Sequence, residues 1–209
     1  MNPVSVIFIH GNHKKATSWN VTDFGKVINI EATIKKKNRT LLIQVDDFTV
    51  SPSKLVRSFV ESMKDQQWII VCHSLGIVYC YEFVKHLKIV GICFIDCTPL
   101  DETFLKKLSC NIDNTCDELN SVAPSSSSRD ELLYDYIKNI RWDLSPKIIC
   151  HVHINYQSDE KFDRKVKYFS SITRKNDKSK MMIHPGKGHM IHYNDSAKII
   201  DSITQLIKY

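Results

Sequence analysis

The chain has 209 residues and a formal net charge of +6, with 43% hydrophobic and 25% charged residues. These values are typical of a soluble globular protein that buries one sizeable core. The lysines are spread along the chain and form no basic face with interleaved aromatic residues, so we expect no nucleic-acid partner.

Seven cysteines occur in the chain, several of them inside apolar runs, and no two of them stand in a CxxC spacing. This pattern favours buried free thiols over a disulfide framework and argues against a structural zinc site. The apolar run at the N-terminus is too short for a membrane span and lacks the features of a signal peptide. We therefore expect a cytoplasmic location and no metal.

Strand-like and helix-like segments alternate along the chain. The expected strands are residues 4–10, 40–45, 68–72, 90–96, 147–154 and, more weakly, 180–184, and most of them are apolar on both alternating positions. The expected helices are residues 17–36, 53–66, 76–87, 162–173 and 196–207. This alternation predicts an α/β fold with a mainly parallel sheet of about six strands and helices on both faces.

One region interrupts the alternation. Residues 98–146 contain no convincing strand, and a Pro- and Ser-rich stretch precedes a candidate amphipathic helix at about residues 130–140. We interpret this region as a short insertion that packs over one end of the sheet, within a single domain of residues 1–209.

A serine stands where the third expected strand passes into a helix. The segment Cys72-His73-Ser74-Leu75-Gly76 is close to the G-x-S-x-G pattern of a nucleophile elbow, with cysteine in place of the first glycine. In such a strained turn the serine hydroxyl is exposed, and the backbone N–H of Leu75 can help to stabilise an oxyanion. The alternative is a serine that caps the helix N-terminus.

A base and an acid for this serine follow later in the chain. His189 lies in the glycine-bracketed segment Gly186-Lys187-Gly188-His189, directly after the last expected strand. Asp159 follows the fifth expected strand, so the order is serine, aspartate, histidine, as in an α/β-hydrolase. The first strand ends in His10-Gly11, and the backbone N–H of Asn12 is the candidate for a second oxyanion donor.

Together these motifs resemble the α/β-hydrolase superfamily over nearly the whole chain. The segments carrying the resemblance are VIFIHG from Val6, CHSLG from Cys72, VGICFIDCTP from Val90 and GKGHMIHYND from Gly186. The resemblance implies a triad of Ser74, Asp159 and His189, backbone donors at Asn12 and Leu75, and a short lid at residues 98–146. Asp96 is a rival acid, because some members of the superfamily carry the carboxylate at that strand end.

The implied activity is that of a serine hydrolase that needs no cofactor. It would cleave a carboxylic ester, or a thioester, through an acyl-enzyme. Apolar residues of the insertion, such as Leu100, Phe104 and Leu105, suggest a small, partly hydrophobic ester substrate. Two alternatives remain: a binding or receptor module with slow or absent turnover, and a lyase that uses the triad for proton transfer. His151 and His153 are two apart on a strand, and we interpret them as a packed or hydrogen-bonded pair rather than metal ligands.

Overall fold

A computed structural model of the chain describes residues 4–9, 11, 19–23, 26–36, 38–43, 51–61, 63, 66–112, 127–140 and 143–209. The six strands of its main sheet are β1 (Ser5–Ile9), β4 (Thr40–Ile43), β5 (Gln67–His73), β6 (Lys88–Ile95), β7 (Ile149–Tyr156) and β8 (Lys180–Pro185). Their order is β4-β1-β5-β6-β7-β8, and every neighbouring pair is parallel. This confirms the α/β fold and the parallel six-stranded sheet expected from the sequence.

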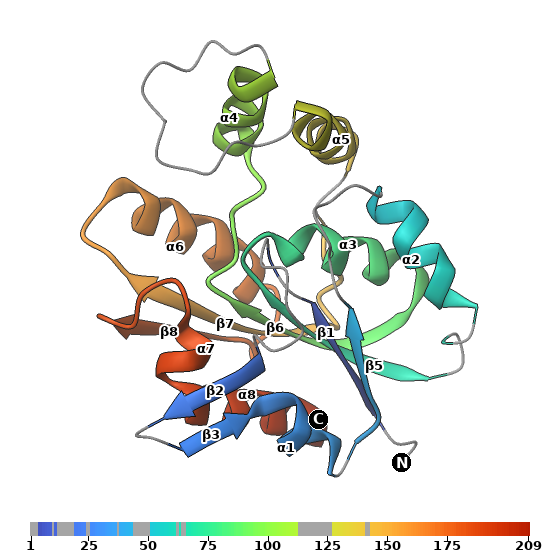
Figure 1. The fold of residues 1–209 in the computed structure, drawn as a ribbon, viewed down its shortest axis with the longest axis vertical. Helices are drawn as coiled ribbons and strands as arrows, with labels where there is room; N and C mark the ends of the chain where they lie inside the picture. The colour runs from blue at the N-terminus through green and yellow to red at the C-terminus, as the bar shows by residue number, and fades with distance from the viewer. Residues whose placement is uncertain are drawn as a thin grey trace.

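Helices cover both faces of this sheet (Figure 1). One face carries α2 (Pro52–Val60), α3 (Ile77–His86) and α6 (Glu160–Thr173), and the other carries α1 (Ile30–Lys35) and α8 (Ser196–Lys208). The buried apolar residues form two clusters, one on each side of the sheet. The central strands are therefore buried on both faces, which explains why the sequence shows continuous apolar runs instead of alternation.

Residues 20–23 and 26–29 differ from the expected helix over residues 17–36. They form two paired antiparallel strands, β2 (Asn20–Asp23) and β3 (Lys26–Asn29), and α1 begins only at Ile30. Each strand contains two adjacent β-branched residues, which favour extended backbone, and Gly25 lies in the sequence between them. The preference of these β-branched residues for extended backbone explains why strands form where a helix was expected.

The insertion between β6 and β7 contains two helices, α4 (Glu102–Ile112) and α5 (Ser127–Lys138). The sequence predicted α5 but not α4. The two helices lie side by side at one end of the molecule, beyond α3 and α6 (Figure 1). Leu108 of α4 and Leu133 and Ile137 of α5 are buried in the cluster on the α3 side. That the insertion acts as a lid stays a prediction.

The strand order of the sheet reverses at β1 and β5. From β1 the chain passes to β4 on one side, and it then returns to β5 on the other side of β1. In open parallel sheets, ligands bind beyond the carboxyl ends of the strands at such a reversal of strand order. Among the described helices, none has the length and hydrophobicity that crossing a membrane requires.

Candidate active site

Ser74 follows the carboxyl end of β5 directly, at the start of a short 3₁₀ turn over Ser74–Gly76 that leads into α3. Its φ is 54°, a left-handed conformation that is unfavourable for a residue with a side chain. The surrounding fold supports this strain, since the backbone N–H of Thr98 donates to the carbonyl of Ser74 at 3.3 Å. The strained turn is therefore present where the sequence predicts a nucleophile elbow, and Ser74 keeps partial exposure to solvent.

Gly11, just past β1, lies against Ser74 on the neighbouring strand. A Cβ at this position would approach Cβ of Ser74 to 2.6 Å, the carbonyl of His73 to 3.0 Å and Oγ of Ser74 to 3.2 Å. Only a residue without a side chain permits this approach. Gly11 thus brings the backbone that follows β1 beside the serine hydroxyl.

Cys72 occupies the position where the elbow pattern has glycine. Its side chain is fully buried, with Sγ lying 3.8 Å from Sγ of Cys97. The Cys97 thiol in turn donates to the carbonyl of Cys72 at 3.3 Å. Burial above all, and then the neighbouring thiols, raises the pKa of Cys72 well above its ordinary value. Cys72 therefore packs as a protonated thiol beneath the elbow and does not compete with Ser74 as a nucleophile.

His189 lies between β8 and α7 (Ile191–Asn194), on a loop with two left-handed glycines. Gly186 and Gly188 have φ values of 68° and 67°, which glycine adopts without steric cost. Nε2 of the buried His73, next to Ser74, lies 3.1 Å from the carbonyl of His189. Because a carbonyl only accepts, this nitrogen carries the proton. The two rings also pack with centroids 4.6 Å apart, so His73 joins the histidine loop to the elbow.

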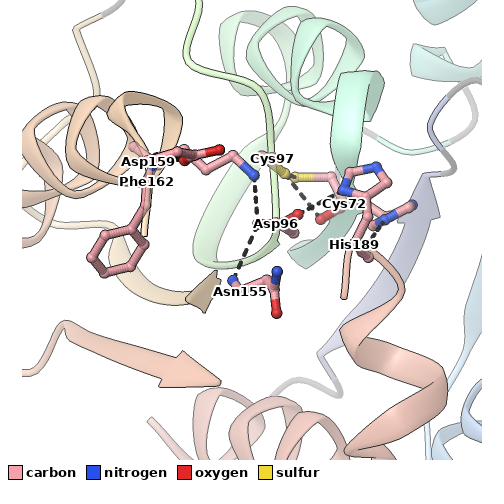
Figure 2. Close-up of polar contacts among 9 residues, drawn as sticks. Cys72, Asp96, Cys97, Asn155, Asp159, Phe162 and His189 are labelled. Carbon is pink, nitrogen blue, oxygen red and sulfur yellow. Dashed lines mark hydrogen bonds and ion pairs between the residues drawn. The ribbon is translucent and has the colours of Figure 1, made fainter. Parts of the chain in front are cut away.

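The carboxylate bonded to His189 is that of Asp96, directly after β6. Its Oδ2 lies 2.6 Å from Nδ1 of His189 (Figure 2). The prediction that Asp159 orients His189 is therefore wrong. Asp159 is the N-cap of α6, and its Oδ1 accepts from the backbone N–H of Phe162 at 3.0 Å. An exposed carboxylate that satisfies a helix N-terminus in this way has a structural role.

Asp96 is buried and has an unusual backbone, with a side chain 3% exposed and a φ of 41°. Its Oδ1 accepts from the ammonium of Lys165 at 2.6 Å and from the backbone N–H of Asn155 at 3.2 Å. Burial alone would raise the pKa of this carboxyl, but the hydrogen bond to His189 and the cation of Lys165 outweigh burial and hold the pKa below its usual range. Asp96 is therefore an ionised partner for His189.

The other predicted site residues have mixed outcomes. Leu75 follows Ser74 in the 3₁₀ turn, where an oxyanion donor is expected, whereas Asn12 lies outside the described residues. Nδ1 of His153 bonds to Nε2 of His184 at 2.8 Å, so its partner is not His151. Leu100, which suggested a hydrophobic substrate, is only 2% exposed and belongs to the core.

Sequence reasoning missed two contributors to this arrangement, Lys165 and the ring of His73. Lys165 is one of three lysines in the segment EKFDRKVK of α6, and no local pattern distinguishes it. The sequence did contain a signal that Asp159 stands at the start of a helix. Acidic residues at Glu160 and Asp163 follow it in the first helical turn, which is typical of a helix start.

Comparison with known proteins shows the α/β-hydrolase fold. No family model matches the chain, and no curated protein matches its sequence. An esterase from Thermogutta terrifontis superposes with a TM-score of 0.65 at 11% identity, over 99% of this chain and 90% of that one. A marine microorganism esterase superposes with a TM-score of 0.63 at 15% identity, over 99% of this chain and 95% of that one. AqDC, described for ring-cleavage of the Pseudomonas quinolone signal, reaches 0.61 at 9%, over 100% and 92%.

Proposed function

We propose that this chain is a serine hydrolase that cleaves a carboxylic ester or thioester through an acyl-enzyme, with Ser74, His189 and Asp96 as its triad. The arrangement around His189 carries the proposal. Its Nδ1 lies 2.6 Å from the buried Asp96, and its carbonyl is bonded to His73, the residue next to the left-handed Ser74. The named esterases among the structural neighbours support the same class of reaction.

The hydrogen bonds assign the two nitrogens of His189. Nδ1–H donates to Asp96, because an ionised carboxylate only accepts. In the neutral ring Nε2 then carries the lone pair and is the atom that takes the proton of Ser74 as Oγ attacks the substrate carbonyl. The imidazolium that forms is stabilised by the negative charge of Asp96.

The tetrahedral oxyanion is held by the backbone N–H of Leu75 and, in this proposal, by that of Asn12. Loss of one such donor typically lowers kcat by about a hundredfold or more. His189 next protonates the leaving alcohol or thiol, and the acyl group of the substrate remains on Oγ of Ser74 as an ester. Water, deprotonated by His189, then attacks this ester, and His189 returns the proton to Oγ of Ser74 as the C–Oγ bond breaks and the acid leaves. No step requires a cofactor.

Hydrolysis of p-nitrophenyl acetate, butyrate and octanoate tests the proposal. We expect turnover by the wild type and background rates for Ser74→Ala and His189→Ala, and the chain-length profile would test the expected hydrophobic preference of the substrate. A folded wild type with no more activity than Ser74→Ala on every ester would instead favour a binding module on this fold. Conversion of a substrate that has an acidic C–H bond but no ester, without any acylation of Ser74, would favour a lyase.

A further inference from the structure

Lys165 reaches from α6 to the carboxylate that orients His189. Its ammonium donates to Oδ1 of Asp96 at 2.6 Å, and its side chain is 17% exposed. In Figure 2 several of the marked polar contacts meet at Asp96, between α6, whose N-cap is Asp159, and the loop of His189. The contact is therefore a largely enclosed ion pair and not a surface one, which sets it apart from the exposed lysines of this chain.

The two carboxylate oxygens of Asp96 have separate partners. Oδ1 receives Lys165 and the backbone N–H of Asn155, and Oδ2 receives Nδ1 of His189. A carboxylate with a single partner can rotate and exchange its oxygens. With Oδ1 held by two donors from α6 and β7, Oδ2 stays directed at His189.

The charge of Lys165 has a second consequence. Asp96 and Lys165 together are neutral, so protonation of His189, whose side chain is 44% exposed, gives the three side chains one net positive charge. Without the cation, the same imidazolium would face a bare carboxylate and would form more readily. The geometry thus makes Lys165 act on both the orientation and the protonation of the base.

We infer that Lys165 is a positioning residue of the proposed reaction, which fixes Asp96 against His189 and offsets the negative charge that the imidazole faces. This inference rests on the proposed function. A buried ion pair by itself is weak support for a role in stability, since the cost of desolvation offsets much of the attraction.

Other groups face the pair from the surrounding elements. His73 of β5 contacts His189, and His192 of α7 packs on His73 with ring centroids 4.5 Å apart. Arg164, next to Lys165 on α6, is paired with Asp101 at 2.9 Å. Lys187 precedes His189 by two residues on the same loop. All are present in each variant below, so a difference between variants reports Lys165 alone.

The test is the pH profile of kcat/KM for p-nitrophenyl butyrate in Lys165→Gln and Lys165→Arg. Glutamine keeps a hydrogen-bond donor but removes the charge, and arginine keeps the charge. For Lys165→Gln we expect the acid limb to move to higher pH, because the cation that opposes protonation of His189 is removed. We also expect kcat at pH 7 to fall by about tenfold with KM little changed. Lys165→Arg should keep the wild-type midpoint, as should the control Lys167→Met on the exposed side of α6.

Two results would overturn the inference. One is a pH profile of kcat/KM for Lys165→Gln that superposes on that of the wild type, with kcat within twofold. The other is a Lys165→Gln chain that does not fold, which would give Lys165 a structural role only. An NMR titration of the His189 ring resonances gives a readout without turnover. If the wild type hydrolyses no ester, the proposed function fails. In that case the NMR titration still tests the inference. A His189 midpoint that is higher in Lys165→Gln than in the wild type would support the action of Lys165 on Asp96 and His189, and an unchanged midpoint would reject it.

Discussion

Nδ1 of His189 lies 2.6 Å from Oδ2 of Asp96, although the two residues are 93 positions apart in the chain. The contact joins the end of β6 to the loop that follows β8, strands that flank β7 in the sheet. It determines which nitrogen of His189 is free to act as a base, and it removes Asp159 from the site. The proposed chemistry therefore depends on Asp96.

The comparison of Asp96→Asn with Asp159→Asn tests this assignment. For Asp96→Asn we expect a loss of kcat of roughly a thousandfold or more, because the amide cannot stabilise the imidazolium. Asparagine is as good an N-cap as aspartate, so Asp159→Asn should keep activity within about twofold. Ester hydrolysis at saturating substrate measures both. The assignment of Asp96 would fail if the losses were reversed.

Gly11 provides a test of the close approach between β1 and the elbow. In Gly11→Ala the new Cβ would lie 2.6 Å from Cβ of Ser74, so one of the two backbones must move. Such overpacking typically costs about 1–3 kcal/mol, and here we also expect most of the activity to be lost. Urea unfolding and ester hydrolysis measure the two effects.

Gly91→Ala is the matched control for Gly11. Its Cβ would approach Cδ2 of Leu206 to 3.1 Å, which is the end of a flexible side chain on α8. We expect this variant to keep wild-type activity. Full activity in Gly11→Ala would show that the approach to Ser74 is not needed for catalysis.

Glu82 links α3 to α5 and gives a prediction for acid stability. This buried carboxylate accepts from Lys85 at 2.8 Å and from the phenol of Tyr136. Burial would raise its pKa, but the hydrogen bonds from Lys85 and Tyr136 prevail and lower the pKa to about 2. Because the pKa is lower in the folded than in the unfolded chain, its stabilisation is full above the ordinary value of 4.5 and is lost as the pH falls towards 2.

We therefore expect Glu82→Gln to be less stable than the wild type at pH 6 and the difference to shrink between pH 4.5 and 2. Urea unfolding across this range measures it, and activity at pH 7 should be unchanged. A difference that stays constant with pH would show that the folded chain does not favour the ionised form of Glu82.

His153 is the centre of a buried hydrogen-bonded chain from Ser202 through His153 and His184 to Asp195. Burial above all lowers the pKa of His153 to about 3. The unfolded chain binds this proton from about pH 6.5, so acid should destabilise the wild type progressively below that pH. We expect His153→Gln to lose less stability than the wild type between pH 6.5 and pH 4. Equal losses in the two chains would contradict a neutral His153 in the fold.

The elbow and the histidine loop were predictable because their signals are local. A serine between an apolar run and Gly76, and a histidine behind Gly186 and Gly188, each mark one special turn. The choice between Asp96 and Asp159 was harder, since both follow strands. The acidic residues Glu160 and Asp163 mark Asp159 as a helix start, but only the positions of the two side chains in space show which one reaches His189. The left-handed φ of Asp96 leaves no mark in the sequence, and neither does the approach of Lys165 from α6. The paired strands β2 and β3 were missed because each has only four residues, which is too short to be distinguished by its sequence pattern from part of the helix expected over residues 17–36.

The central claim is that Ser74 becomes acylated, and rapid mixing with p-nitrophenyl acetate tests it most directly. We predict a burst of nitrophenol approaching one equivalent per chain in the wild type, an acetyl group on Ser74 in the acid-quenched protein, and neither in Ser74→Ala. Release that is linear from the start, no faster than with Ser74→Ala and without any acetylated serine, would contradict the account.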